Sequence, residues 1–382
     1  MSEPVPGATI GVVGGGQLGR MLAEAASPLG VEIVVLDPTP DCPAYPPVAD
    51  QIVADFDDPS AIRDLAERVD VLTLEIELAD PDALRAAHEA TGTPIHPDPS
   101  TLETTRDKET EARHLADADV PVAGFQSVDD AADLRAAFEA FGPPLMLKAR
   151  RGGYDGRGNS VVGTVEEAAE YFGSLDGLIA ESLVDFEREL SVIGVRGADE
   201  RATFPVVENV HEEEILRETL VPARTTDRVR QRATDVARQV LDELDGRGVF
   251  GIELFETTDG TILVNEIAPR PHNSGHYTIE GTVTSQFEQH VRAILGAPLG
   301  DTTLREPTAM VNVLGTGEES RPAMLSGVED ALATPGAHFH WYGKRDVRPL
   351  RKMGHVTATG ASVADARETA QTAREHVTFE EP

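Results

Sequence analysis

The fold of this chain is read first from residues 251–276, GIELFETTDGTILVNEIAPRPHNSGH. Residues Ile252–Phe255 show the side-chain alternation of a strand, and the Thr-Asp-Gly that follows indicates a tight turn. A second short strand then returns over Thr261–Val264. The segment therefore predicts an antiparallel hairpin.

This hairpin places Glu253 on one strand and Asn265 and Glu266 at the end of its neighbour. Two carboxylates and an amide form an all-oxygen site that suits a hard cation such as Mg²⁺, which leaves its other positions to water and phosphate oxygens. Anion-facing donors follow directly in Arg270, His272, Asn273 and His276. The alternative is a surface hairpin with acidic edges, which is common in acidic chains.

The composition indicates a soluble, cytoplasmic protein of two or three domains. The chain has 382 residues, no run of about 18 apolar residues, and an N-terminus unlike a signal peptide. Cys42 is the only cysteine, so an internal disulfide is excluded.

The charge is strongly acidic. The formal net charge is −34, with 67 acidic and 33 basic residues, and such a surface repels nucleic acid and anionic membranes. Lysine accounts for four of the basic residues, namely Lys108, Lys148, Lys344 and Lys352. An acidic, lysine-poor surface indicates adaptation to concentrated salt, and the four lysines become candidates for chemistry.

The N-terminal region predicts a strand, glycine-rich turn, helix and second strand. Thr9–Val13 precedes GGGQLGR, and Val31–Leu36 ends at Asp37. This pattern resembles a dinucleotide fingerprint, but the same turn holds other phosphorylated ligands. Strand Val69–Leu74 runs into Glu75 and Glu77, which we expect at the ligand-binding edge of the sheet, although solvated edge carboxylates are the alternative.

The middle of the chain predicts a phosphate-binding unit. A helical segment, Thr104–Asp119, carries Lys108, and strand Pro144–Ala149 carries Lys148. Residues 150–160, RRGGYDGRGNS, form a glycine-rich loop whose N–H groups can cover phosphates. The loop is not a P-loop, because GxxxxGK[ST] is absent. A mobile hairpin tip is the alternative.

Further polar groups follow along the chain. Residues 181–184 form an extended hinge that suits an adenine edge, and Glu189, predicted to open a strand, can accept ribose hydroxyls. His211 is either a ligand contact or a surface histidine, and a long helix is predicted over Thr226–Leu244. Near the C-terminus, HWYGKRDVRPLRKMGHVTATG at 340–360 holds a rare basic cluster.

Five motifs in this order resemble the ATP-grasp superfamily and, within it, the N5-carboxyaminoimidazole ribonucleotide synthase family. They are GGGQLGR, LEIE, GGYDGRG, VNEIAPRPHNSGH and WYGKRDVRPLRKMGH, and they span about residues 9–360. The resemblance implies ATP-dependent carboxylation of aminoimidazole ribonucleotide with bicarbonate, through carboxyphosphate or CO₂ released from it. It also implies a homodimer, with ATP and Mg²⁺ as cofactors and no nucleic-acid or membrane partner.

The resemblance implies site residues where this sequence matches the family. ATP would contact Lys108, Lys148, Gly153, Tyr154, Asp155, Gly156, Arg157, Gly158, Asn159, Glu181, Ser182, Leu183, Val184, Glu189, His211, Asn265 and Glu266. The metal would lie at Glu253, Glu266 and Asn265. Aminoimidazole ribonucleotide would contact Gly15, Gly16, Gln17, Leu18, Glu75, Asn273, Ser274, Lys344, Arg351 and Lys352. The catalytic set would be Glu75, Tyr154, Arg270, Lys344 and Arg351. The stretch LEIELAD departs from the family after its second Glu, which leaves the role of Glu77 open.

The predicted fold is therefore α/β and α+β, with an ATP-grasp architecture. Residues 1–103 form a Rossmann-like substrate-binding domain, residues 104–300 the ATP-grasp domain with a mobile subdomain at about 120–182, and residues 301–382 a small β-rich domain. Three alternatives stay open: a formate-dependent glycinamide ribonucleotide transformylase, an NAD-dependent dehydrogenase, and a nucleotide-binding regulatory protein without turnover.

The acidic surface predicts that stability depends on salt. Repulsion among 67 carboxylates opposes compaction when it is unscreened, so the melting temperature should rise as KCl increases from low to molar concentration. Thermal unfolding followed by circular dichroism across that range measures the effect. A melting temperature indifferent to KCl would contradict adaptation to salt.

Overall fold

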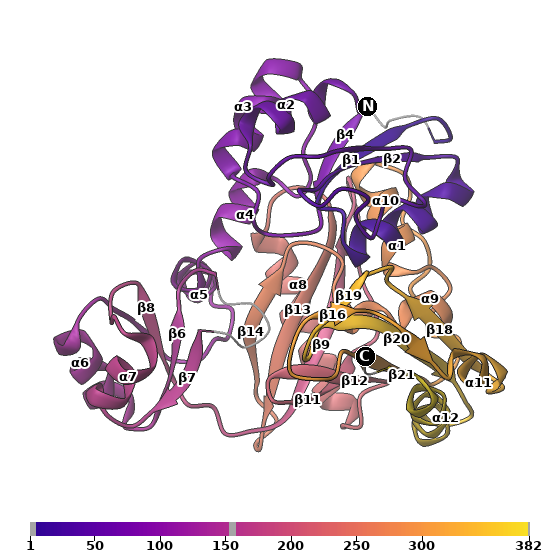
Figure 1. Cartoon of the computed structure of the whole chain (residues 1–382). Coiled ribbons are helices and arrows are strands. Elements are labelled where there is room, and N and C mark those ends of the chain that lie inside the picture. The colour runs from indigo at the N-terminus through magenta and orange to yellow at the C-terminus, as the bar shows by residue number, and fades with distance from the viewer. Residues whose placement is uncertain (1–4, 153–157, 381–382) are drawn as a thin grey trace.

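The computed structural model describes residues 5–152 and 158–380 (Figure 1). In that part of the chain, no helix combines the length and apolar character needed to cross a membrane.

The N-terminal region forms a parallel sheet, as predicted. Its order is β3 (Asp50–Ile52), β2 (Glu32–Leu36), β1 (Thr9–Val13) and β4 (Val71–Leu74). Nearly all residues of β1, β2 and β4 are buried, because helices cover both faces of such a sheet. The associated helices are α1 (Gln17–Ala26), η1 (Ser27–Leu29), α2 (Pro59–Glu67) and α3 (Pro81–Thr91).

The helical segment predicted over Thr104–Asp119 is helical over most of its length and carries Lys108, but it is interrupted at residues 106–107, because two helices occupy this region. They are α4 (Pro99–Thr105) and α5 (Lys108–Asp117), and Asp107 separates them in an extended conformation. The Asp107 carboxylate accepts hydrogen bonds from the backbone N–H groups of Glu109 and Thr110, so a new helix starts there. Lys108 is consequently the first residue of α5.

A smaller antiparallel sheet stands to one side of the molecule in Figure 1. Its order is β5 (Phe125–Val128), β8 (Leu178–Ser182), β6 (Leu145–Ala149) and β7 (Asn159–Val162). Helices α6 (Ala131–Phe141) and α7 (Val165–Phe172) pack on it around a separate apolar core. This sheet presents Lys148, near the end of β6, toward the rest of the chain.

The central element is a nine-stranded sheet. Its strands run in the order β14 (Ile262–Ala268), β13 (Gly248–Thr257), β9 (Phe186–Arg196), β11 (Val207–Glu212), β12 (Ile215–Val221), β15 (Thr308–Leu314), β20 (Lys352–Thr359) and β18 (Ala337–Trp341), with β10 (Arg201–Thr203) beside β9. Strand β9 starts before Glu189, which therefore lies inside the strand rather than opening it. The segment around His211 forms the β11–β12 hairpin before helix α8 (Asp227–Glu243) begins.

The C-terminal strands β15, β20 and β18 continue this same sheet instead of forming one of their own. The remaining elements are η2 (Asn273–Gly275), α9 (Thr278–Gly281), α10 (Gln286–Ile294), β16 (Arg321–Pro322), β17 (Leu325–Ser326), α11 (Val328–Ala333), β19 (Asp346–Val347), α12 (Val363–His376) and β21 (Thr378–Phe379).

A buried histidine joins the N-terminal sheet to the central one. The Nδ1 atom of His290 on α10 accepts a hydrogen bond from the N–H of Val249 (3.1 Å), so its proton lies on Nε2. That nitrogen donates to Oγ1 of Thr73 on β4 at 2.7 Å. Burial lowers the pKa of His290 to about 3, with a smaller contribution from His96.

This contact predicts acid lability. Because the folded pKa of His290 lies below its ordinary value, its contribution is intact above about pH 6.5 and is lost as the pH falls toward 3. The loss at pH 5 amounts to about 2 kcal/mol. The free energy of unfolding should therefore fall between pH 7 and pH 5 by about 2 kcal/mol less in His290→Gln than in the parent, as measured by denaturant unfolding. Equal losses would contradict this role, and His376→Gln, at an exposed position, is the control.

Candidate functional site

Two carboxylates face each other across the β13–β14 hairpin, as predicted, although Asn265 and Glu266 lie inside β14 rather than at the end of a strand. Glu253 and Glu266 are direct register partners, and directly opposite residues share one face of an antiparallel pair. The register then shifts, so that Leu254 pairs with Val264 and Asn265 is the extra residue of a bulge. A bulge interrupts the alternation of side chains, which lets the consecutive Asn265 and Glu266 both meet lysines.

The two lysines come from different elements. Nζ of Lys108, at the start of α5, lies 3.2 Å from Oε2 of Glu266. Nζ of Lys148 lies 2.7 Å from Oε2 of Glu181 and donates to Oδ1 of Asn265 at 3.2 Å. The Lys148 side chain is only 9% exposed, so its charge depends on these oxygen partners.

The electrostatics of the carboxylate pair are uneven. Burial raises the pKa of Glu253 to about 7, and the nearby charge of Glu266 adds to the effect, while His211 and Lys352 oppose it. Burial also disfavours ionised Glu266, but Lys108 and Lys148 outweigh it and lower the pKa of that carboxyl. A cation between the two carboxylates would relieve the repulsion that Glu253 experiences.

The donor set suits Mg²⁺. Within residues 5–152 and 158–380, no group of three His, Cys, Asp or Glu side chains is arranged to hold a metal ion. Two carboxylates with an adjacent amide match the way Mg²⁺ binds, since it keeps waters and takes phosphate oxygens.

Glu189 and His211 lie together on neighbouring strands. Nδ1 of His211 on β11 is 2.8 Å from Oε2 of Glu189 on β9. Burial opposes the charged imidazole, but the contact with Glu189 prevails and raises the pKa of His211. The pair offers a carboxylate and a ring N–H beside the carboxylate hairpin.

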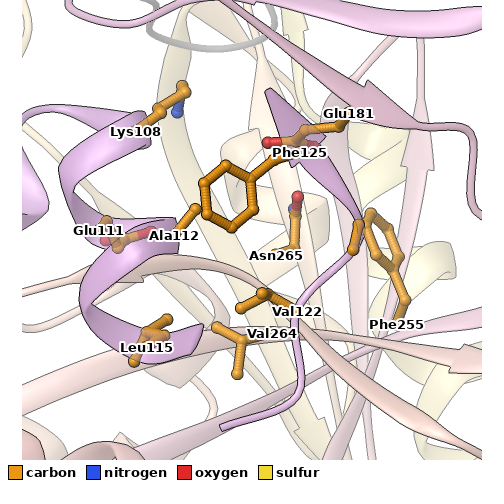
Figure 2. Close-up of a pocket in the computed structure, with 11 residues that line it drawn as sticks. Lys108, Glu111, Ala112, Leu115, Val122, Phe125, Glu181, Phe255, Val264 and Asn265 are labelled. Atoms are coloured by element: carbon orange, nitrogen blue, oxygen red, sulfur yellow. The ribbon is translucent and has the colours of Figure 1, made fainter. Parts of the chain in front are cut away.

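A pocket of mixed apolar and polar lining lies beside Lys108 (Figure 2). It is lined by Lys108, Glu111, Ala112, Leu115, Val122, Ala123, Phe125, Glu181, Phe255, Val264 and Asn265. Of these, Phe255 carried a detectable signal, because it lies two residues after Glu253 on a strand and so shares its face. Lys108, Glu181 and Asn265 were predicted as ATP contacts. The other lining residues come from α5, β14, and β5 with the segment before it, and only the tertiary structure brings them together. Leu115, Phe125 and Phe255 supply apolar walls, and Lys108, Glu181 and Asn265 lie beside them.

The glycine-rich turn is organised by a carboxylate. Backbone N–H groups of Gly16 and Gly19 both donate to Glu75, and Gly15 N–H donates to Oδ2 of Asp37 at 2.9 Å. A Cβ atom on Gly14 would lie 2.2 Å from Cγ of Glu75, so glycine is required for this approach. Glu75 therefore occupies the start of α1, where a dinucleotide pyrophosphate would bind.

The C-terminal basic segment reaches this same turn. Nζ of Lys344 donates to Oε1 of Gln17 at 2.6 Å and to the backbone oxygen of Lys352, and it lies 5.5 Å from the ring centroid of Tyr342. Lys344 and Gln17 are 327 residues apart in sequence. Arg351, half-buried, donates to the backbone oxygen of Asp346 at 2.7 Å.

Glu77, whose role the sequence left open, pairs with Arg270 in the structure. Nε of Arg270, only 9% exposed, lies 2.8 Å from Oε1 of Glu77, which ties the end of the N-terminal sheet to the segment after β14. The neighbouring Asn273 and Ser274 are buried and bond internally, to Asn312 and Ser191 respectively. In this structure they hold the turn, and their contact with substrate stays a prediction.

The structure describes some of the remaining predicted site residues, and these lie in several different elements. Gly153, Tyr154, Asp155, Gly156 and Arg157 lie outside the described residues. Gly158 and Asn159 lead into β7, Leu18 is buried in α1, and Ser182 ends β8 and accepts a hydrogen bond from Gly124 N–H. Leu183 and Val184 follow in the connection to β9. His276 is fully buried among Phe287, Tyr342 and His355, which removes it from the anion-facing donors.

Three family models match consecutive parts of the chain. They are the ribonucleotide synthetase preATP-grasp domain over residues 7–106, the ATP-grasp domain over 113–287, and the phosphoribosylaminoimidazole carboxylase C-terminal domain over 308–369. The glycine-rich turn lies within the preATP-grasp match, and the Glu253–Glu266 hairpin lies within the ATP-grasp match.

Individual relatives agree along nearly the whole length. The N5-carboxyaminoimidazole ribonucleotide synthase of Bacillus subtilis is 42% identical over 355 residues, which cover 92% of this chain and 91% of that protein. The phosphoribosylaminoimidazole carboxylase of Ogataea methanolica is 43% identical, with 94% of this chain and 67% of that protein covered.

Solved structures agree in shape. The N5-carboxyaminoimidazole ribonucleotide synthetase of Thermotoga maritima superposes with a TM-score of 0.89 at 40% identity, over 98% of this chain and all of that one. The Aspergillus clavatus enzyme, solved with ADP and aminoimidazole ribonucleotide, gives a TM-score of 0.88 at 36% identity, with 97% of this chain and 98% of that one covered. The chain therefore belongs to the N5-carboxyaminoimidazole ribonucleotide synthase family of ATP-grasp enzymes.

Proposed function

We propose that this chain carboxylates 5-aminoimidazole ribonucleotide with bicarbonate, using ATP and releasing ADP and phosphate, in purine biosynthesis. The observation that carries the proposal is the meeting of two constellations in one molecule. The Glu253–Glu266 pair with Lys108 and Lys148 suits a nucleoside triphosphate, and the glycine turn with Glu75, Gln17 and Lys344 suits a second polar substrate.

ATP would lie between the small sheet and the central sheet. Its base would enter the pocket of Figure 2 beside Glu181–Val184, and its ribose would meet Glu189 and His211. Lys108 and Lys148 would hold the phosphate charge. Glu253, Glu266 and Asn265 would hold Mg²⁺, which supplies charge stabilisation for phosphoryl transfer when bound.

The chemistry follows from these positions. Bicarbonate is a weak electrophile, so transfer of the γ-phosphoryl group from ATP to one of its oxygens gives carboxyphosphate, and the exocyclic amine of the ribonucleotide then attacks its carbon or the CO₂ released from it. No nucleophilic side chain is required, since positioning and charge complementarity lower the barrier. Arg270, held by Glu77, and the Lys344–Arg351 segment provide cations near the site for the anionic groups.

Several finer points are part of the proposal. Mg²⁺ is supported by the donor set, a salt-rich cytoplasm by the acidic composition, and a homodimer by the family resemblance. We propose domains at 1–103, 104–300 and 301–382, with the small sheet, in about 120–182, as a mobile subdomain.

An ADP-release assay tests the function. Bicarbonate plus aminoimidazole ribonucleotide should stimulate ADP release, whereas formate plus glycinamide ribonucleotide should not. Glu266→Gln should abolish the stimulated rate, and Glu187→Gln, at an exposed position, should leave it unchanged. Stimulation by formate plus glycinamide ribonucleotide alone would replace the proposal with the transformylase reaction, and strong binding of NADH would favour a dehydrogenase.

The raised pKa of Glu253 predicts pH-dependent metal binding. Ionised Glu253 is the form that binds Mg²⁺, and its pKa is about 7, so binding should release a proton near pH 7 and weaken as the pH falls to 6. Below the pKa the affinity should fall up to about tenfold per pH unit. Calorimetric titration with Mg²⁺ in two buffers of different ionisation enthalpy measures both quantities. The proposal predicts no proton release from Glu253→Gln, and equal affinities of the parent at pH 6 and pH 8 would refute it.

We expect that Lys148 and Lys344 cannot be replaced by arginine without loss of activity, because other groups closely surround their ammonium groups. Lys148 is held by Glu181 and Asn265, and Lys344 by Gln17 over the Tyr342 ring, so the wider guanidinium would displace the charge. Displacement by about 1 Å costs on the order of a hundredfold, which is the expected loss of kcat/KM for Lys148→Arg and Lys344→Arg. Lys108→Arg is the matched comparison and should be mild, because family members often have arginine there. Parent-like kinetics for the first two variants would show that lysine is not required.

A further inference from the structure

The break between α4 and α5 is built around one buried carboxylate. Asp107 is 2% exposed, and its Oδ1 atom accepts hydrogen bonds from the N–H groups of Glu109 and Thr110, both at 3.2 Å. Other helices also start at aspartates, but Asp98 and Asp130 cap theirs at exposed positions, and Asp58 is only partly buried. A helix cap alone therefore does not explain why Asp107 is buried.

Two arginines complete the coordination of Asp107. Arg150 donates from Nε to Oδ1 at 3.1 Å and from Nη2 to Oδ2 at 2.9 Å, and Arg151 donates from Nε to Oδ2 at 3.0 Å. Burial opposes the ionised form, yet the hydrogen bonds from Arg150, Thr110 and Arg151 together lower the pKa of Asp107. The carboxylate is thus a charged junction with five donors.

The arginines belong to the small sheet. Arg150 directly follows β6, the strand that carries Lys148, and its backbone oxygen accepts the N–H of Lys108 at 2.9 Å. Arg150 also pairs with Glu109 at 2.7 Å. The first turn of α5 is therefore attached by both backbone and side chains to the strand of the other lysine.

The opposite side of the same helical turn is attached to the central sheet. Oε2 of the buried Glu111 accepts the N–H of Ile267 at 3.3 Å, one residue after Glu266. Lys108 itself contacts Glu266 at 3.2 Å. The start of α5 is consequently fixed between β6 and β14, the two strands that supply Lys148 and the carboxylate.

We propose that Asp107 is a positioning residue for the ATP-dependent reaction: through Arg150 and Arg151 it sets Lys108 relative to Lys148 and Glu266. The inference rests on the proposed function, because it assigns the two lysines to the phosphates of ATP. Asp107 itself is buried, so we assign it no direct contact with substrate. It acts by fixing the backbone of Lys108, whose N–H donates to the Arg150 carbonyl and whose side chain reaches Glu266 from that point.

A double-mutant cycle tests the proposal. Asp107→Asn keeps the shape and one accepting oxygen but removes the charge and faces two arginines with an amide. It should lower kcat/KM for ATP by about tenfold to a hundredfold, the range expected for a misplacement of about 1 Å. Lys108→Met removes the group that Asp107 positions. If Asp107 acts through Lys108, the double variant should equal Lys108→Met within about twofold.

Control variants separate positioning from folding. Asp98→Asn alters an exposed aspartate that caps the preceding helix, where it accepts from Ser100 N–H at 2.9 Å, and should keep the parent kcat/KM. Arg150→Gln leaves Asp107 in place and should reproduce the loss. It also supplies the measurement if Asp107→Asn does not fold.

The outcomes distinguish the two proposals. Absence of substrate-stimulated ADP release by the parent would remove the proposed function, whatever the variants do. An active parent with a parent-like Asp107→Asn, or with losses from Asp107→Asn and Lys108→Met that multiply in the double variant, would overturn the positioning role alone. Calorimetric titration with ADP adds a readout independent of turnover, and Asp107→Asn should weaken ADP binding only where Lys108 is present.

Discussion

The repulsion between Glu253 and Glu266 is the constraint on which the rest of the site depends. Two carboxylates that face each other on a half-buried hairpin cannot both ionise without cations nearby. The chain supplies those cations from α5, β6 and β20, so segments far apart in sequence must meet at one hairpin. The uneven result, with the pKa of Glu253 raised and that of Glu266 lowered, leaves one carboxylate ready to gain from a metal ion.

The glycine turn shows how one sequence pattern serves different chemistry. In a dinucleotide-binding protein, glycines let a pyrophosphate approach the start of the helix. Here Gly14, Gly16 and Gly19 let the carboxylate of Glu75 approach instead, and a Cβ at Gly14 or Gly16 would collide with it. Because Lys344 joins the same turn through Gln17, the turn is completed by the C-terminal part of the chain.

The start of α5 is held in place by hydrogen bonds to buried acidic side chains. Asp107 and Glu111 are buried acids on either side of Lys108, and each is held by donors from a different sheet. Buried carboxyl groups are costly unless they find hydrogen-bond partners, so such an arrangement favours one geometry. The pocket of Figure 2 lies beside this helix, and Lys108 and Glu111 are among the residues that line it.

The sequence by itself determined the elements whose signals are local. The Glu253–Glu266 hairpin, the parallel N-terminal strands and the lysine positions follow from alternation, turn residues and composition, and the structure confirms the hairpin and the strands. Tertiary structure decided what depends on distant partners. The break at Asp107 needs Arg150 and Arg151, the bulge at Asn265 needs the register of β13, and the pairing of Glu77 with Arg270 needs two domains to dock. Periodicity records which face of an element is buried, whereas these features are fixed by which polar groups must find partners after burial.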